Sequence, residues 1–416
     1  MQNTLFTNDN LLILNGLNSN IADLIYLDPP FNSKRTYSAP IGTKAAGASF
    51  KDMWTWQDID EAYLDKLIEK YPALVDFINS IEATHSKPMK AYITYIAQRM
   101  IQLQRILKET GSIYLHCDPT ASHYLKQMMD CIFGKENFRN EIVWCYQGTG
   151  EPKKYFKRKH DIVLFYAKNH KMVFFNQEGS SEPISEFSKS KYTKEDGGGK
   201  YKEIKHKDGK IYKQYIRSHQ RYQDVWQIPI INAMSKERTG YPTQKPLALL
   251  DRIIKASSKE GDLVLDPFCG CATTCVASQH LNRKWIGIDI ETKAVEVLHD
   301  RLEAQGNFLE NDKFIHRLDI PQRTDIPQIL PTDKTAKEQL YKEQKGRCNA
   351  CDIDMRIVDF EVDHIIPRAK GGGNYYENYQ LLCASCNRIK GARPMEYLRA
   401  KIITRAKYIK KIQFGE

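Results

Sequence analysis

The stretch that decides the fold is residues 262–270, which read Asp-Leu-Val-Leu-Asp-Pro-Phe-Cys-Gly. Its short apolar run ends at Asp266 and a proline, which predicts a buried strand of a parallel sheet. Gly270 and the small residues after it predict a tight turn into a helix. A second apolar run, 285–290, follows that helix and contains Asp289 near its end. Strand, turn, helix and strand in this order predict a unit of an α/β fold.

The alternation of strands and helices continues toward both ends of the chain. Apolar runs predict strands at 22–27 and 112–117, and helical spacing covers about 88–110, 121–133 and 246–258. We therefore predict a doubly wound, Rossmann-like α/β sheet. A chain of 416 residues is too long for one ordinary core, so two or three folded units are expected.

Charge is concentrated in two basic blocks. The net charge is +11, and residues 151–240 contain 20 Lys and Arg against 11 Asp and Glu. Residues 331–416 contain 17 against 11. Tyrosines interleave with the lysines of the first block, and cations beside aromatic rings suit a nucleic-acid surface. The blocks favour nucleic acid as a partner; a Lys-rich surface that only confers solubility is the alternative.

The turn after Asp266 is also a place where a ligand can bind. Small residues there let a ligand approach the backbone at the open edge of a parallel sheet. Asp289, about 20 residues further on, stands where an acid can accept hydrogen bonds from both hydroxyls of a ribose. A nicotinamide or nucleotide enzyme would use the same geometry, although the Gly-x-Gly-x-x-Gly pattern is absent from this turn.

Residues 28–31, Asp-Pro-Pro-Phe, follow an apolar strand. An exocyclic amine on a ring is a poor nucleophile because its lone pair is delocalised. Two acceptors on its N–H groups, the Asp28 carboxylate and the Pro29 carbonyl, bias the nitrogen toward a form that can attack a methyl group in line. Pro30 stiffens the turn, and Phe31 can stack on a base flipped out of the duplex. For an isolated motif, a strand that ends in a Pro-Pro turn is the alternative.

Several motifs together resemble the amino-methyltransferases of DNA, and their order resembles the beta class of that family. These motifs lie within residues 5–310 and are Asp28-Pro-Pro-Phe, Tyr241-Pro-Thr-Gln-Lys-Pro-Leu, Asp266-Pro-Phe-x-Gly and Asp289. The resemblance implies S-adenosylmethionine as cofactor and double-stranded DNA as partner. It implies Asp266, Phe268 and Gly270 at the methionine end of the cofactor and Asp289 at its ribose. It also implies that Thr243 and Lys245 line the site.

The resemblance divides the chain as well. Residues 1–150 are expected to form the catalytic half of a methyltransferase, 151–240 the region that reads the DNA target, and 241–320 the half that binds the cofactor. A polar segment with prolines, 321–335, is expected as a linker. Residues 336–416 are expected to form a separate small domain.

Two departures from the family pattern bear on the cofactor. Alanine stands at position 272, where the family usually has a second glycine. Because alanine is the smallest replacement, cofactor binding is expected to survive. The family also often has an Asp near Asn15-Gly16 that contacts the adenine of the cofactor, and here Asn15 or Asn18 is expected in that role.

The form of the catalytic motif bears on the target base. The sequence contains no Pro-Cys dipeptide, so the covalent cysteine route to carbon 5 of cytosine has no support. In the family, the Asp-Pro-Pro-Tyr/Phe form is typical of adenine N6 and a Ser-led form of cytosine N4. We therefore expect methylation of adenine, with cytosine N4 as the alternative.

The cysteines near the C-terminus form two Cys-x-x-Cys pairs, Cys348/Cys351 and Cys383/Cys386. Four thiolates in such an arrangement favour a structural zinc ion. The pairs are separated by more residues than a simple zinc ribbon has, so a folded segment is expected between them.

That segment contains Asp363-His-Ile-Ile-Pro and Asn378-Tyr-Gln-Leu-Leu, and Asn387-Arg-Ile-Lys follows the second pair. Over about 340–395 the sequence resembles the HNH endonuclease motif with its ββα-metal core. His364 suits the base that activates water, and Asp363 and Asn387 offer hard oxygens to a catalytic Mg²⁺ or Mn²⁺. Asn378 is expected to orient the histidine loop. A zinc-stapled module that only binds DNA is the alternative.

The sequence as a whole predicts a site-specific adenine DNA methyltransferase fused to a metal-dependent HNH endonuclease, as in restriction–modification. No apolar run approaches the ~20 residues of a membrane span, and the N-terminus lacks a signal-peptide pattern, so a cytoplasmic protein is expected. A homodimer stays open as an oligomeric state. The rival class is a non-catalytic nucleic-acid-binding protein, which cofactor binding would exclude.

Overall fold

The computed structural model describes residues 3–33, 35–40, 42–55, 59, 70–148, 151–184, 186–304, 314–368, 372–393, 395, 397–399 and 401–402. Within these residues the central sheet has nine strands in the order β13-β6-β7-β5-β2-β14-β15-β1-β16. Their bounds are β1 (Thr4–Thr7), β2 (Ala22–Leu27), β5 (Leu107–Cys117), β6 (Phe138–Cys145), β7 (His160–Ala167), β13 (Val225–Gln227), β14 (Leu263–Asp266), β15 (Lys284–Asp289) and β16 (Ile315–Arg317). Neighbouring strands are parallel except where β7 pairs with β5 and β6. The predicted doubly wound α/β sheet is confirmed.

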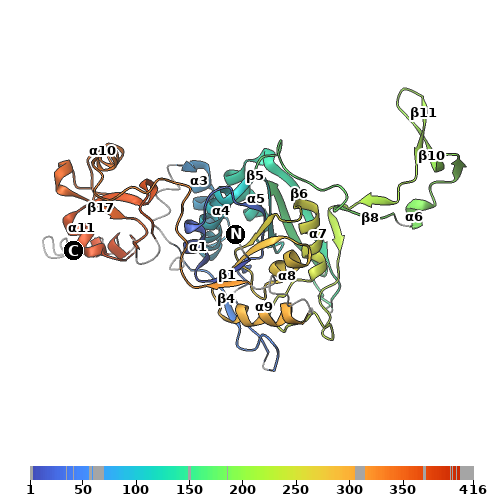
Figure 1. Cartoon of the computed structure of the whole chain (residues 1–416), viewed down its shortest axis with the longest axis horizontal. Helices are drawn as coiled ribbons and strands as arrows, with labels where there is room; N and C mark the ends of the chain where they lie inside the picture. The colour runs from blue at the N-terminus through green and yellow to red at the C-terminus, as the bar shows by residue number, and fades with distance from the viewer. Residues whose placement is uncertain are drawn as a thin grey trace.

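Helices cover both faces of this sheet (Figure 1). One face carries α1 (Asn10–Gly16), α3 (Pro72–Thr84), α4 (Lys87–Ile106) and α5 (Ser122–Phe133), and the other carries α7 (Leu247–Ser257), α8 (Thr273–His280) and α9 (Lys293–Glu303). Alternate residues of β2 serve the two sides: Ile25 and Leu27 pack in the core of the first face, and Leu24 and Tyr26 in that of the second. Burial on both sides explains why the strand reads as a continuous apolar run.

The basic block 151–240 contributes to two parts of the molecule. Strands β7 and β13 lie within this range, so the range expected to read DNA also contains two strands of the central sheet. The residues between them form an arm that extends from the sheet on the side away from the C-terminal domain (Figure 1). The arm consists of β8 (Ser181–Pro183), α6 (Glu186–Lys189), β9 (Lys194–Asp196), β10 (Gly199–Lys205), β11 (Ile211–Tyr215) and β12 (His219–Arg221).

Two further strands, β3 (Arg35–Ser38) and β4 (Ser49–Asp52), pair antiparallel after the Asp-Pro-Pro-Phe motif. Of the helices in the described part of the chain, none combines the length and the apolar character that crossing a bilayer requires.

The C-terminal domain has its own small core. It contains α10 (Lys334–Glu343), β17 (Phe360–His364), β18 (Tyr379–Cys383) and α11 (Ala384–Lys390), with single 3-10 turns at Ile357–Asp359 and Tyr376–Asn378. Leu340, Phe360, Leu381 and Leu382 are buried together between these elements. Two antiparallel strands followed by a helix give the ββα order that the sequence predicts.

The segment expected as a linker is held against the body that contains the central sheet. The Asn18 side chain exchanges two hydrogen bonds of 2.8 Å with Thr324, and the backbone N–H of Ser19 donates to Asp325 at 2.9 Å. Arg323 pairs with Asp325 at 2.9 Å, and this contact holds the pKa of Asp325 below its ordinary value. These contacts fix the path of the chain where it leaves the sheet.

Candidate active sites

One cavity of about 610 Å³ lies at the carboxyl edge of the central sheet. Strands β2, β14 and β15 are neighbours and parallel, so their last residues meet at this edge. The cavity is lined by these residues that the sequence assigned to methyl transfer and cofactor binding: Asp28, Pro29, Pro30, Phe31, Thr243, Lys245, Asp266, Phe268, Gly270 and Asp289. Segments more than 200 residues apart in sequence therefore share one site.

The two oxygens of Asp28 have different environments. Oδ2 accepts a hydrogen bond from Lys245 Nζ at 2.5 Å, and this ammonium group also lies 5.4 Å from the centre of the Phe31 ring. Oδ1 is buried and has no hydrogen-bond partner among the described residues. An unpaired buried acceptor is costly unless a ligand provides the donor.

The turn that follows the motif is held by a residue that sequence reasoning missed. The backbone N–H groups of Asn32 and Ser33 donate to the carboxylate of Asp52 at 2.5 and 3.0 Å. Asn32 has a positive φ of 61°, a conformation that Asn tolerates better than most residues. Asp52 ends β4 and belongs to no recognisable motif, so the sequence offered no signal for it.

Asp266 and Asp289 end β14 and β15, and both carboxyl groups are buried against hydrogen-bond donors. Asp266 accepts from Phe268 N at 3.0 Å and from the Thr274 hydroxyl at 2.5 Å. Asp289 accepts from the backbone N–H of Gly270 at 2.8 Å. Burial raises the pKa of Asp266 to about 7 and that of Asp289 to about 6. The site therefore holds two carboxyl groups whose charge changes near neutral pH.

The small-residue turn between β14 and α8 depends on left-handed backbone at two positions. Gly270 has φ 52°, and a Cβ placed on it would lie 3.0 Å from the ring of Tyr241. Ala272, the first residue before α8, has φ 57°. Glycine adopts this backbone conformation without strain, which explains why the family usually has glycine at this position. This chain has alanine there and bears the conformational cost.

The polar residues that line the cavity at the start of α1 are not the asparagines that the sequence suggested for contact with the cofactor's adenine. Asn15 and Asn18 are absent from the lining of this cavity, whereas Asp9 at the N-terminus of α1 is part of it. Asp9 caps the helix by accepting from Leu11 N at 2.7 Å and pairs with Arg99. The Asn-Asp-Asn run before the apolar stretch was a readable helix-start signal.

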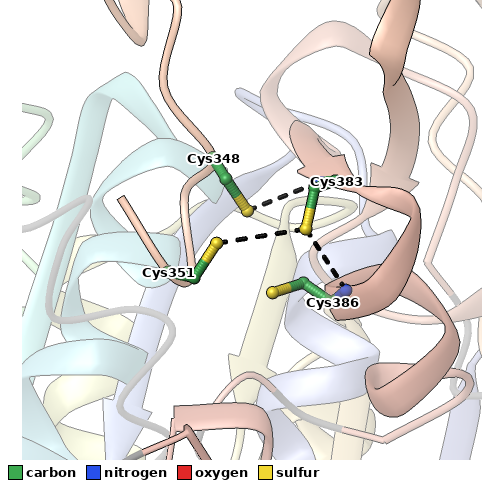
Figure 2. Close-up of side chains that lie close together, drawn as sticks. All are labelled: Cys348, Cys351, Cys383 and Cys386. Carbon is green, nitrogen blue, oxygen red and sulfur yellow. Dashed lines mark hydrogen bonds between the residues drawn. The ribbon is translucent and has the colours of Figure 1, made fainter. Parts of the chain in front are cut away.

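The four cysteines of the C-terminal domain come together (Figure 2). Their sulfur atoms lie within 4.8 Å of one another, and Cys351 Sγ lies 3.9 Å from Cys383 Sγ. Burial raises the pKa of the Cys348 thiol, but the backbone N–H groups of Cys351, Cys383 and Ala350 and the Cys351 side chain together outweigh burial and lower it, whereas burial raises the pKa of Cys351 and Cys386. Backbone donors aimed at sulfur suit a cluster of thiolates.

The residues of the HNH motif are each engaged by another side chain. Asp363 accepts from Gln380 Nε2 at 2.7 Å and pairs with the fully buried Lys390 at 2.9 Å. His364 and Asn387 have partners of their own: His364 Nε2 lies 2.9 Å from Asn374 Oδ1, and Asn387 Nδ2 donates to Glu361 Oε2 at 2.6 Å. Sequence reasoning missed Lys390, although it follows Asn387 by one helical turn.

Asn378 lies inside the loop that follows His364. Its amide accepts from Ile366 N at 2.9 Å and donates to the carbonyls of Ile366 and Gly373 at 3.1 Å. The side chain therefore ties the two ends of this loop together. Gly371, the first of three consecutive glycines in this loop, lies outside the described residues.

A Rossmann-like sheet with this cavity at its carboxyl edge is the architecture of a methyltransferase. Residues 22–300 match the DNA methylase family, and residues 348–393 match the HNH endonuclease family. The chain belongs to the DNA methylase family and carries a C-terminal HNH endonuclease domain.

Several named methyltransferases are similar to the chain. The chain is 29% identical over 308 residues to the type II methyltransferase M.HpaI of Haemophilus parainfluenzae, covering 74% of this chain and 76% of the relative. It is 27% identical over 227 residues to the DNA adenine methyltransferase YhdJ of Escherichia coli, covering 52% and 69%. Among solved structures, the PvuII DNA methyltransferase, described as cytosine-N4-specific, is 12% identical with a TM-score of 0.45, covering 76% and 95%.

Proposed function

We propose that the chain transfers a methyl group from S-adenosylmethionine to the N6 amino group of an adenine flipped out of double-stranded DNA. The observation that carries this proposal is the environment of Asp28. Its Oδ1 atom is buried beside the cavity, without a hydrogen-bond partner in the described part of the chain. Such an orphan acceptor costs about 1–3 kcal/mol, and an N–H group of the target amine would satisfy it.

Each residue of the motif has a task in this proposal. Asp28 Oδ1 and the Pro29 carbonyl accept the two N–H groups of the amine, and Pro30 keeps the turn stiff. Lys245 holds Oδ2 and so fixes the rotation of the carboxylate. Phe31 offers a ring on which the flipped base can stack.

The residues on the other side of the cavity suit the cofactor. We assign Asp266, Phe268 and Gly270 to its methionine end and Asp289 to its ribose hydroxyls, with Thr243 and Lys245 in the wall between. Carboxylates suit an ammonium group and a pair of hydroxyl donors. A volume of about 610 Å³ is within the range of about 300–1,000 Å³ common for ligand sites. When bound, S-adenosylmethionine supplies an electrophilic methyl group.

The identity of the methylated base is tested by product analysis. Plasmid DNA is incubated with the protein and S-adenosylmethionine labelled in the methyl group, digested to nucleosides and separated by chromatography. We expect N6-methyladenine, in keeping with the motif form and with the adenine methyltransferase among the relatives. Asp28→Ala should abolish the label, and Asp300→Ala, on the exposed side of α9, should retain it. Label in N4-methylcytosine alone would contradict the adenine assignment.

The cysteine cluster is proposed as a structural zinc site. Tetrahedral zinc with Zn–S bonds of about 2.3 Å requires sulfur atoms about 3.8 Å apart. The separation of 3.9 Å between Cys351 and Cys383 suits this geometry. Zinc would fix the start of α11 and thereby the position of Asn387.

We further propose that the C-terminal domain is a metal-dependent endonuclease. His364 would activate water, while Asp363 and Asn387 would bind Mg²⁺ or Mn²⁺. Metal-dependent cutting of plasmid that is lost in His364→Ala would support this activity. A module that only binds DNA is the second candidate, because Lys390 and Gln380 already engage Asp363. Plasmid that stays intact with either metal would favour that candidate.

The two activities together would constitute restriction–modification, in which methylation protects the site that the nuclease cuts. The arm formed by β8–β12 is the proposed reader of the target. It exposes Ile211, Tyr212 and Tyr215 beside lysines, and side chains of these kinds can contact base edges and phosphates.

A further inference from the structure

A buried histidine lies directly behind the catalytic motif. His116, near the end of β5, is fully buried, and its ring lies 5.7 Å from the ring of Phe31. Its Nε2 atom lies 3.1 Å from Asp161 Oδ2, and its Nδ1 atom lies 2.9 Å from the Tyr26 hydroxyl. A buried imidazole with polar partners on both nitrogens is held in one orientation.

Asp161, on β7, is the carboxylate partner of this histidine. Burial by itself raises the pKa of Asp161, but the hydrogen bond and charge interaction with His116, the charge of Lys245 and the hydrogen bond from Tyr146 together outweigh burial and lower it. The Tyr146 hydroxyl donates to the other oxygen, Oδ1, at 3.1 Å. Asp161 therefore stays ionised at neutral pH with both oxygens oriented, and it can stabilise a positive charge on the imidazole.

The same imidazole approaches the catalytic carboxylate. Nδ1 of His116 lies 4.0 Å from Oδ1 of Asp28, the oxygen that is left without a hydrogen bond among the described residues. The Tyr26 hydroxyl contacts the same ring nitrogen. Burial, and next the charge of Asp28, raise the pKa of Tyr26 well above its ordinary value, so this hydroxyl keeps its proton.

We propose that His116 receives, through Asp28, the proton that the target amine loses, and that Asp161 holds the imidazole ready for it. The inference rests on the proposed methyl transfer. In that reaction the N–C bond forms and the C–S bond breaks, with its electron pair left on sulfur. The amine nitrogen becomes cationic and gives one proton to Asp28 Oδ1. The proton reaches His116 Nδ1 after the Tyr26 hydroxyl has turned away from that nitrogen and the 4.0 Å between Nδ1 and Oδ1 has closed to hydrogen-bond distance. Solvent takes up the proton after the methylated base has left the cavity.

The balance of charge in the pocket supports this route. Methyl transfer removes the positive charge of the sulfonium and creates one proton, so a proton on His116 leaves the total charge unchanged. The positive charge then lies 3.1 Å from Asp161 instead of on the product. Titratable groups surround His116 on its own strand and on the segments packed against it. They are Tyr26 on β2 and Asp28 after it, Tyr146 after β6, Asp161 on β7, Lys245 before α7 and Cys117 at the end of β5.

The test compares single-turnover methylation by wild type, His116→Gln and Asp161→Asn between about pH 5 and pH 9. An imidazole that already carries a proton cannot accept another, so the wild-type rate should fall toward acid pH. With S-adenosylmethionine saturating at every pH, so that the titration of Asp266 and Asp289 does not limit the rate, His116→Gln should be slower by about 100-fold at neutral pH and should lose this acid dependence. Asp161→Asn should be slowed less. His123→Gln, which changes an exposed histidine on α5, is the matched control and should behave as wild type.

A second readout separates this role from simple support of the pocket. A duplex with 2-aminopurine at the mapped target position reports base flipping by fluorescence, and calorimetry reports cofactor binding. We expect both to be unchanged in His116→Gln. The inference is overturned if this variant keeps the wild-type rate over the whole pH range, or if flipping and cofactor binding fall together with the rate. A wild-type protein that binds the cofactor but methylates no base would contradict the proposed function itself, and this inference with it.

Discussion

The two chemical centres of the chain hold their key aspartates in opposite states. In the methyltransferase cavity, Asp28 gives one oxygen to Lys245 and leaves the other buried and, among the residues described, unpaired. In the HNH domain, Lys390 and Gln380 both contact the carboxylate of Asp363. The Asp28 carboxylate can still accept a hydrogen bond from a ligand, whereas the Asp363 carboxylate already has protein partners.

This difference indicates what each centre needs before it can act. An unpaired acceptor can take a neutral N–H donor without any prior change in the protein. A carboxylate paired with a buried lysine must give up some of that contact before it can bind a divalent cation. The methyltransferase cavity is thus arranged in advance, and the HNH centre is expected to be arranged by the Mg²⁺ or Mn²⁺ that we propose it binds.

Removal of one thiolate should have the largest effect and should separate the two centres. Metal binding contributes about 10–16 kcal/mol of apparent free energy to small zinc domains, so Cys351→Ser should leave the C-terminal domain unfolded and free of zinc. Methylation should persist, because the central sheet has its own core. Zinc analysis and limited proteolysis measure the loss, with Cys131→Ser in α5 as the control. If the C-terminal domain of Cys351→Ser is folded without zinc, the cysteine cluster is not what holds this domain together.

Substitution of Lys390 sharpens the comparison within the HNH domain. Breaking a buried ion pair costs about 3–5 kcal/mol because one charge is left without its partner. Lys390→Met should therefore destabilise the domain by this amount, and Mg²⁺ should stabilise the variant more than wild type, since the cation replaces the lost charge. Thermal unfolding with and without Mg²⁺ measures both effects. Equal stabilisation of the two proteins would indicate that Asp363 does not bind the metal.

The affinity for S-adenosylmethionine should depend on pH. The methyltransferase cavity suits this cationic cofactor only when its carboxyl groups are ionised. The pKa of Asp266 is about 7 and that of Asp289 about 6 in the free protein. A cationic cofactor favours the ionised forms, so protons must leave on binding and acid must oppose it. Affinity should fall by up to about tenfold per pH unit between about pH 7 and pH 6, where Asp266 takes up its proton, and more steeply below pH 6, where Asp289 does so as well. Calorimetry checks this, Asp266→Asn should flatten the dependence, and a constant affinity would contradict it.

The smallest expected effect concerns the backbone of the turn between β14 and α8. Ala272 has φ 57°, a conformation that costs an L-residue about 1–2 kcal/mol and glycine almost nothing. Ala272→Gly should therefore stabilise the protein by about 1 kcal/mol without loss of cofactor affinity. Denaturant unfolding measures the gain, and Ala294→Gly within α9 should instead destabilise. Destabilisation by Ala272→Gly would mean that its methyl group contributes more through packing than the backbone costs.

The sequence predicted the sheet and the meeting of its motifs for a simple physical reason. Asp28, Asp266 and Asp289 each end an apolar run, and parallel strands bring such ends to one edge. The contact between Lys245 and Asp28 was not predictable, because it depends on how the segment before α7 folds over β2. Strand β7 was hidden in the basic block, since chain order does not reveal that it inserts between β5 and β6.

The HNH domain shows the same limit at a smaller scale. The spacing of cysteines predicted their cluster because metal ligands follow a pattern in sequence. The ion pair between Lys390 and Asp363 was not predicted, because a lysine in a basic block reads as a solvated charge. Burial of that lysine is a property of the packed helix α11 and strand β17 and cannot be read from either alone.

The most direct test of two independent centres is one plasmid experiment with two variants. Unmethylated plasmid is incubated with S-adenosylmethionine, with Mg²⁺ or Mn²⁺, or with both, and cutting and incorporated methyl groups are measured together for wild type, Asp28→Ala and His364→Ala. Asp28→Ala should cut DNA without methylating it, and His364→Ala should methylate DNA without cutting it. Loss of both activities in either single variant, or cutting that persists in His364→Ala, would contradict the assignment of one reaction to each centre.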